Sequence, residues 1–248
     1  MDDDHIICGV HAVLAALKSR PDHVEEIWVS ETRGDKRMTA VLDAARVAQV
    51  KVHKSPRAAL DRLSQGVKHQ GVVARVRAKP AQKEQDLGSF LAHLPPMPLL
   101  LVLDGVQDPH NLGACLRSAD AAGAHAVIVP REHSAPLSAV ARRAASGAAE
   151  TIPVFQVVNL ARALRELKEA GVWLAGASQE ADTDIFHADL HRPLAIVLGG
   201  EGKGLRRLTQ EECDMLVRIP MAGSVESLNV SVAAGICLFE AVRQRGII

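Results

Sequence analysis

Residues 99–117 read Leu99-Leu-Leu-Val-Leu103-Asp104-Gly-Val-Gln-Asp-Pro109-His-Asn111-Leu-Gly113-Ala-Cys-Leu-Arg117. The apolar run at the start predicts a buried strand over 99–103, and the pattern after the loop predicts a helix over 112–122 that ends at Gly123. A continuously apolar strand that leads through a polar loop into a helix is the repeating unit of a parallel α/β sheet. This stretch therefore decides the fold class of the C-terminal part.

The same alternation continues to the end of the chain. Further strands are expected at 126–129, 152–157, 173–177, 195–198 and 216–219, and further helices at 138–145, 160–170 and 228–245. We expect a parallel sheet with helices on both faces. Ligands of such sheets bind beyond the carboxyl ends of the strands, so the loops that follow the strands are the candidate sites.

The N-terminal part reads as a smaller α/β unit. Its expected helices are 11–17 and 36–48, and its expected strands are 27–30 and 71–76. The segment that follows is rich in Lys, Gln, Glu and Pro, which is typical of a linker with room for one short helix. The sequence therefore predicts a first domain over 1–77, a linker over 78–98 and a second domain over 99–248.

The charge of the chain is divided between these parts. Its 29 basic and 29 acidic residues cancel, which at first argues against a nucleic-acid partner. Residues 1–79, however, hold 14 basic and 10 acidic residues, whereas the remainder holds 15 and 19. With no Tyr, two Trp and four Phe, a module that stacks RNA bases on several aromatic side chains is not expected. RNA recognition would then depend on phosphates, RNA shape and main chain.

The four cysteines exclude some classes of site. Cys8, Cys115, Cys213 and Cys237 are far apart and form no CxxC pair, so no zinc ribbon or redox motif is expected, and no metal site. We expect reduced, mostly buried thiols. An acidic N-terminus and the lack of a long apolar run predict a cytoplasmic protein without a signal peptide or a membrane span.

The first candidate loop holds Asn111 and, four residues after Gly113, Arg117. Arg117 is the only Lys or Arg between Lys83 and Arg131, and its spacing lets it lean over the helix N-terminus. A guanidinium there is suited to clamping a phosphate. The alternative is that Asn111 is a helix N-cap and Arg117 a solvated helical residue.

The second candidate loop reads Leu198-Gly199-Gly200-Glu201-Gly202-Lys203-Gly204-Leu205. Its glycines let main chain approach a ligand, and Glu201 places a carboxylate among them. It fits neither the GxxxxGK[ST] pattern nor the GxGxxG spacing, which disfavours a nucleoside triphosphate or dinucleotide site. The alternative is a tight turn rich in glycine.

The third candidate loop reads Ile219-Pro-Met221-Ala-Gly223-Ser224-Val-Glu-Ser227-Leu228-Asn229-Val-Ser231. Ser227 is a candidate cap for the last helix. Asn229 and Ser231 place polar groups in the first turn of an otherwise apolar helix. Such groups either satisfy the unpaired N–H groups or contact a ligand at the helix N-terminus.

Together the three loops resemble the three motifs of the SpoU/TrmH branch of the SPOUT RNA methyltransferases. The matching residues are Asn111, Gly113 and Arg117, then Gly199-Gly-Glu201-Gly202, then Ile219-Pro, Ser227-Leu-Asn229, Ser231 and Ala233. The N-terminal part fits through Gly9-Val-His-Ala-Val13 and His69-Gln-Gly71. Lys203 stands at a variable loop position. The segments 108–113, 117–123 and 220–223 look like those of the members that methylate a guanosine ribose in the peptidyl-transferase centre of bacterial 23S rRNA.

The resemblance implies a parallel sheet flanked by helices with a C-terminal trefoil knot, preceded by a small L30e-like RNA-binding domain. It implies a homodimer formed through the C-terminal domain, in which Arg117 serves the other subunit's site. It implies S-adenosylmethionine as cofactor, held by Gly176, Gly199, Gly202, Ile219, Met221 and Leu228. The expected catalytic residues are Arg117, Asn111, Glu201, Ser227 and Asn229.

Three other functions make different predictions for this sequence. A tRNA 2'-O-methyltransferase of the same family would carry the same motifs. A noncatalytic rRNA-binding assembly factor predicts decay of the three loops, which are intact here. A small-molecule nucleotide-binding enzyme predicts a phosphate fingerprint, which fails, and leaves the basic N-terminal part unexplained.

Overall fold

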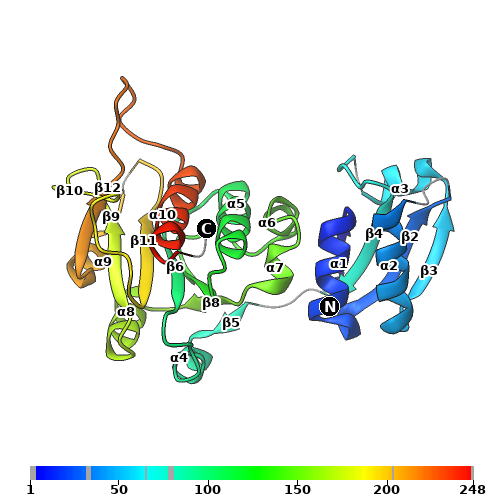
Figure 1. The fold of residues 1–248 in the computed structure, drawn as a ribbon, viewed down its shortest axis with the longest axis horizontal. Coiled ribbons are helices and arrows are strands. Elements are labelled where there is room, and N and C mark those ends of the chain that lie inside the picture. The colour runs from blue at the N-terminus through cyan, green and yellow to red at the C-terminus, as the bar shows by residue number, and fades with distance from the viewer. Residues whose placement is uncertain (1–3, 32–34, 65, 78–80, 203, 247–248) are drawn as a thin grey trace. The chain divides into compact units, whose positions relative to one another are not determined.

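The computed structural model describes residues 4–31, 35–64, 66–77, 81–202 and 204–246. The chain forms two compact units (Figure 1). The first unit comprises Met1–Pro80 with Ala145–Thr151, and the second comprises Ala81–Ala144 with Ile152–Ile248.

The first unit is built on a four-stranded sheet of order β1-β4-β2-β3. β2 and β3 are parallel, and β4 runs antiparallel to β1 and β2. One face of the sheet packs on α1 and α2 through a cluster that includes Val13, Ile27 and Val41. The elements are β1 (Asp4–Cys8), α1 (Val10–Ser19), η1 (Pro21–His23), β2 (Val24–Ser30), α2 (Lys36–Val47), β3 (Lys51–Ser55), α3 (Arg57–Leu63) and β4 (Val72–Arg77).

The second unit is built on an eight-stranded parallel sheet of order β10-β12-β9-β11-β6-β7-β8-β5. Every residue of β6 is buried, as the opening stretch predicts for a central strand. The strands are β5 (Gln82–Lys83), β6 (Leu99–Asp104), β7 (Ala126–Pro130), β8 (Val154–Val157), β9 (Trp173–Ala177), β10 (Thr183–Asp184), β11 (Leu194–Gly199) and β12 (Met215–Arg218).

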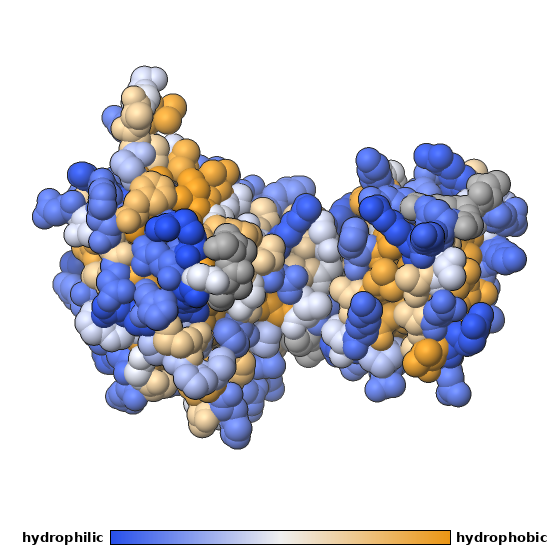
Figure 2. Space-filling model, viewed as in Figure 1, coloured by the Kyte–Doolittle hydropathy of each residue, from blue (hydrophilic) through white to orange (hydrophobic). Residues whose placement is uncertain are grey.

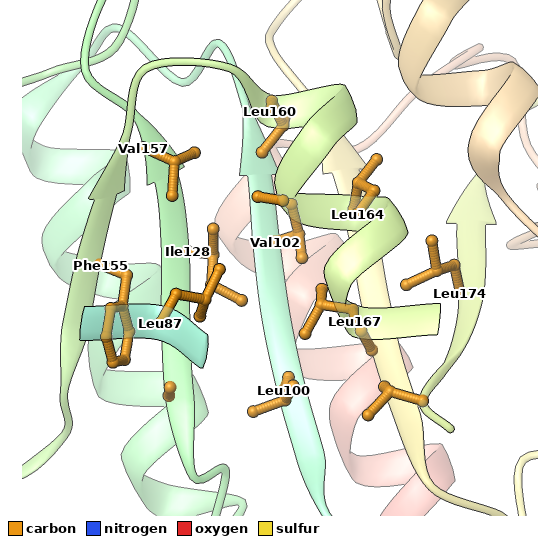
Figure 3. Close-up of a cluster of buried hydrophobic side chains, with 14 of the residues drawn as sticks. Leu87, Leu100, Val102, Ile128, Phe155, Val157, Leu160, Leu164, Leu167 and Leu174 are labelled. Atoms are coloured by element: carbon orange, nitrogen blue, oxygen red, sulfur yellow. The ribbon is translucent and has the colours of Figure 1, made fainter. Parts of the chain in front are cut away.

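Helices cover both faces of this sheet. On one face α4 and α8 pack through Leu87 and Leu164 onto Val102 and Phe155 (Figure 3). α5 and α10 contact each other on the other side of the sheet. The helices are η2 (Glu84–Asp86), α4 (Leu87–Leu91), α5 (Pro109–Ala121), α6 (Ala139–Ala144), α7 (Ala148–Thr151), α8 (Leu160–Glu169), α9 (Arg207–Glu212) and α10 (Val230–Gln244). The expected α/β class is confirmed.

The segment expected as a linker, 78–98, belongs largely to the second unit. β5 pairs with β8, and Leu87 and Leu91 are buried in the core. The polar composition concealed two apolar residues spaced by one helical turn, and burial of that short apolar stripe folds the segment. Residues 78–80 lie outside the described part. Residues 145–151, expected in the second domain, group with the first unit.

All four cysteines carry thiols. Cys115 and Cys237 are buried and Cys213 is half-buried, and burial raises the pKa of each of these three thiols to about 12. Within the described residues, no group of three or more His, Cys, Asp or Glu is placed to hold a metal ion. No described helix combines the length and the apolar character needed to span a bilayer.

Candidate active site

The loops that follow β6 and β11 and the loop that follows β12 meet through three polar side chains. The Nδ2 amide of Asn229 donates to Asn111 Oδ1 at 3.0 Å and to Glu201 Oε1 at 3.3 Å. The Nδ2 amide of Asn111 also donates to Glu201 Oε1. The structure thus brings together three of the five expected catalytic residues, and one carboxylate oxygen accepts from both amides.

Asn111 is free to join this cluster because another residue caps its helix. α5 begins at Pro109, and Asp108 is the N-cap, with its Oδ1 accepting from the His110 N–H at 2.8 Å. The alternative that Asn111 is the N-cap is therefore wrong. Asn111 lies one turn further along and is 9% exposed, with its side chain directed to the other two loops.

Asn229 serves the helix and the cluster at once. It is the N-cap of α10, and its Oδ1 accepts from the Ser231 N–H at 2.9 Å and from the Ser231 hydroxyl at 2.6 Å. Its Nδ2 remains available for Asn111 and Glu201. The last helix accordingly begins at Val230, and Ser227 is not its cap.

The glycines of the second loop allow the chain to fold back on itself. A Cβ on Gly199 would lie 2.0 Å from the carbonyl carbon of Gly204, and one on Gly200 would lie 2.4 Å from Gly105 O. The Gly200 N–H donates to Asp104 O at 2.9 Å. Gly202 adopts a φ of +76° and has no atom near its missing side chain. Lys203 lies outside the described residues.

An ion pair between a buried carboxylate and a half-exposed guanidinium, which the sequence did not suggest, joins the first two loops. Asp104 ends β6 with its side chain fully buried. Its Oδ1 accepts from Arg206 Nε at 2.6 Å and its Oδ2 from the Arg206 N–H at 3.0 Å. The one available signal was a carboxylate at the end of an otherwise apolar strand. The pair fixes the exit of the glycine loop against the start of the first loop.

The residues expected to hold the cofactor lie at or beyond the carboxyl ends of adjacent strands. Gly176 is the second-last residue of β9, Gly199 ends β11 and Ile219 follows β12, and these three strands are neighbours. A Cβ on Gly176 would lie 2.7 Å from Cys213 Sγ, so that position is closely packed. Met221 and Leu228 are half-buried. Main-chain groups and apolar side chains suit a ligand with an apolar ring and no phosphate.

Arg117 and Ser227 are not part of the hydrogen-bonded cluster. Arg117 is exposed on α5 and forms no hydrogen bond or ion pair with any residue that the structure describes. Ser227 is exposed in the loop between β12 and α10, where the Gln179 amide donates to Glu226 O. Glu201 therefore fixes two asparagines in this chain and does not contact Arg117.

Both units match known protein families. The SpoU rRNA Methylase family matches residues 98–239, and the family described as RNA 2'-O ribose methyltransferase substrate binding matches residues 6–82. The chain belongs to the SpoU rRNA methylase family. The family resemblance of the three loops is thereby confirmed, and so is a small domain that precedes the parallel sheet.

Curated relatives match over nearly the full chain. The 23S rRNA (guanosine-2'-O-)-methyltransferase RlmB of Shewanella oneidensis is 54% identical over 245 residues, which cover 99% of this chain and 99% of the relative. The protein of the same name from Escherichia coli (strain K12) is 52% identical over 240 residues, 97% of this chain and 98% of its own.

Solved structures share the fold of both units. The SpoU methyltransferase AviRb from Streptomyces viridochromogenes, in complex with the cofactor AdoMet, has a TM-score of 0.74 at 27% identity and covers 99% of this chain and 92% of its own. The AdoMet-bound rRNA methyltransferase from Sinorhizobium meliloti also has a TM-score of 0.74 at 27% identity, with 97% and 87% covered.

Proposed function

We propose that this protein transfers a methyl group from S-adenosylmethionine to the ribose 2'-OH of a guanosine in bacterial 23S rRNA, in the peptidyl-transferase centre. The observation that carries the proposal is the convergence of three SpoU motifs in the Asn111–Glu201–Asn229 cluster. Relatives that bear this activity in their names share more than half of the residues of the chain. Because the substrate is ribosomal RNA, we place the reaction in the cytoplasm.

The residues proposed to hold the cofactor have a chemistry that suits S-adenosylmethionine. Gly176, Gly199 and Gly202 offer main-chain groups at the strand ends, and Ile219, Met221 and Leu228 offer apolar contact for an adenine ring. The close approaches at Gly176 and Gly199 leave no room for a side chain, which keeps the loops compact around that edge. Bound there, the cofactor supplies an electrophilic methyl group, so the protein has to orient the hydroxyl and assist loss of its proton.

The polar cluster is suited to orienting the ribose. Asn111 and Asn229 are held by Glu201, and this fixes the direction in which their amides point. Ser227 lies two residues before Asn229, in the exposed loop, and completes the proposed set. We assign Glu201 a positioning role, because its carboxylate already accepts from both amides.

Arg117 is assigned to the charge that develops on the hydroxyl oxygen. A guanidinium stays protonated in proteins, so Arg117 stabilises the alkoxide and the neighbouring RNA phosphate instead of acting as a base. Its exposure and its lack of a partner among the described residues leave it available for a phosphate.

A homodimer accounts for the absence of Arg117 from the hydrogen-bonded cluster of its own chain. α10 presents Val232 and Phe239, 49% and 39% exposed, together with half-buried Ile236 on one face. Hydrophobic surface gathers over α10 in Figure 2. We propose that a second copy covers this stripe and receives Arg117 in its site. The knot implied by the family remains a prediction, supported by the return of Asn229 to Asn111.

The predicted first domain, residues 1–77, makes up most of the first unit, and we propose that it binds the RNA. Its four-stranded sheet and its excess of basic residues support this role, as does its match to a substrate-binding family. The matches to two solved structures described as acting on tRNA cover only 66% and 62% of this chain, so neither includes all of both units.

The test is methyl transfer by the intact protein to unmodified 23S rRNA, followed by mapping of the modified ribose. We expect a single 2'-O-methylguanosine in the peptidyl-transferase centre. Transfer to tRNA alone would refute the substrate assignment and keep the enzyme class. Absence of S-adenosylmethionine binding in calorimetry would refute the enzyme class and favour an assembly factor.

A further inference from the structure

One face of the first unit's sheet is only partly covered. Ile27 and Val29 of β2 face the core under α1 and α2. Trp28 lies between them in the strand, so its side chain points to the opposite face. At one end of that face α3 contacts the sheet, where Leu60 and Val73 are buried. Beyond this end the side chains of His53 and Arg75 are 32% and 40% exposed.

Three planar side chains form a row across this face. The rings of Trp28 and His53 stack with centroids 5.6 Å apart and planes 16° from parallel. The Arg75 guanidinium lies 5.3 Å from the centroid of the Trp28 ring. Because β2 lies between β4 and β3, Arg75 and His53 approach Trp28 from opposite sides. The Glu26 carboxylate lies within 4 Å of both outer members and holds the row together.

The row ends at a basic edge strand. β3 is the last strand of the sheet, so the outer face of His53 has no neighbouring strand in the described residues. Lys51 lies on the same face two residues away, whereas Lys54 lies on the opposite face, and residues 51–60 contain no Asp or Glu. An open ring face is thus flanked by positive charge.

We propose that an unpaired RNA nucleotide docks at this edge, with its base stacked on the outer face of His53 and its phosphate on Lys51. The base extends the row of Arg75, Trp28 and His53 by one member. This inference rests on the proposed function, and it names the place in the first unit where the RNA strand is held. A single stacking position of this kind is compatible with the small number of aromatic residues in the chain.

Tryptophan fluorescence provides a direct test, because the chain has only two tryptophans. Trp173→Phe leaves Trp28 as the single reporter. Titration with 23S rRNA, or with a short single-stranded RNA, is expected to change the Trp28 emission, because a base is added to its stack. His53→Ala is expected to weaken RNA binding about tenfold and to abolish the change. His53→Phe keeps a ring at the position and is expected to restore both.

Charge reversal at the edge provides the second arm. Lys51→Glu is expected to weaken RNA binding. It is also expected to lower the slope of log affinity against log salt concentration by about the amount of one phosphate contact. Arg46→Glu is the matched control, because it makes the same charge change at an exposed position of α2, which packs on the other face of the sheet. We expect this control to keep most of the affinity.

The outcomes separate this inference from the proposed function. Methyl transfer to 23S rRNA at saturating RNA tests the proposed function alone. We expect His53→Ala to raise the RNA concentration that gives the half-maximal rate and to leave the maximal rate unchanged. Tight RNA binding with unchanged Trp28 emission and no effect of His53→Ala would overturn the stacking site and leave the methyltransferase intact. Binding by His53→Ala equal to that of His53→Phe would overturn it as well.

Discussion

The candidate site residues of the second unit are hydrogen-bonded to one another near the ends of strands. The candidate RNA contacts of the first unit lie instead on a half-exposed sheet face. Glu201 accepts from two asparagines and Asp104 is fully buried against Arg206. Lys51 and His53, in contrast, face solvent at a sheet edge. A preorganised cluster suits one small reacting group, and an exposed basic face suits a long polyanion. Substitutions in the two units should therefore affect different quantities.

The largest expected effect is on rate, from Arg117→Ala. Loss of the guanidinium removes charge stabilisation from the reacting oxygen, so we expect methyl transfer to fall by about 10²- to 10³-fold. The affinity for S-adenosylmethionine, measured by calorimetry, is expected to stay within about twofold of the wild-type value. Arg131→Ala is the control at another exposed arginine. A near-normal rate for Arg117→Ala would contradict the role.

Glu201→Gln sharpens the comparison inside the second unit. A glutamine at this position keeps one acceptor oxygen for the two asparagine donors, but it loses the negative charge that strengthens both hydrogen bonds, so the asparagines are held less firmly. We expect methyl transfer to fall by about tenfold or more with unchanged affinity for RNA. Glu211→Gln, on exposed α9, removes the same charge without touching the cluster and is expected to keep the rate. Equal losses in both variants would show a general charge effect.

Asp104→Asn tests whether the ion pair of the buried Asp104 carboxylate with Arg206 stabilises the second unit. It leaves the half-exposed Arg206 guanidinium without its carboxylate, and we expect a loss of about 1–3 kcal/mol in the free energy of unfolding. Arg207→Ala breaks an exposed pair with Glu211 and is expected to cost about 0.5 kcal/mol or less. Denaturant unfolding of the two variants measures the difference. Equal costs would contradict the importance of burial.

The smallest effect concerns thiol reactivity. Burial raises the pKa of Cys115, Cys213 and Cys237 to about 12, so these thiols stay protonated as the pH rises to about 11. Since the thiolate is the reactive form, a disulfide reagent at pH 8 is expected to label half-buried Cys8 of the first unit first. Rapid labelling of more than one thiol in the native protein would contradict this order.

The sequence predicted the second unit better than the first for a physical reason. Strands such as β6 are continuously apolar, because both faces of the sheet are covered. β3 was missed because Lys51 and Lys54 interrupt its apolar pattern at an edge where half of the strand meets solvent. The predicted linker, 78–98, is too long. Its polar composition hid the helical spacing of Leu87 and Leu91, which are buried in the core.

The candidate site was predictable only in part. Parallel strands end at one edge, which explains why Asn111, Glu201 and Asn229 meet. The pairing of Asp104 with Arg206 spans 102 residues between two ordinary residue types, and no local pattern encodes it. The stacking of Trp28 on His53 likewise depends on strand register, which sequence periodicity does not fix.

The division of labour between the units is tested most directly by deleting residues 1–77 and titrating the remaining chain with S-adenosylmethionine and, separately, with 23S rRNA. Circular dichroism checks that the remaining chain is folded. We predict a dissociation constant for the cofactor within about twofold of the full-length value, and RNA binding weaker by about tenfold or more, because the basic edge strand is lost. A folded fragment that keeps full RNA affinity, or loses the cofactor, would contradict the account.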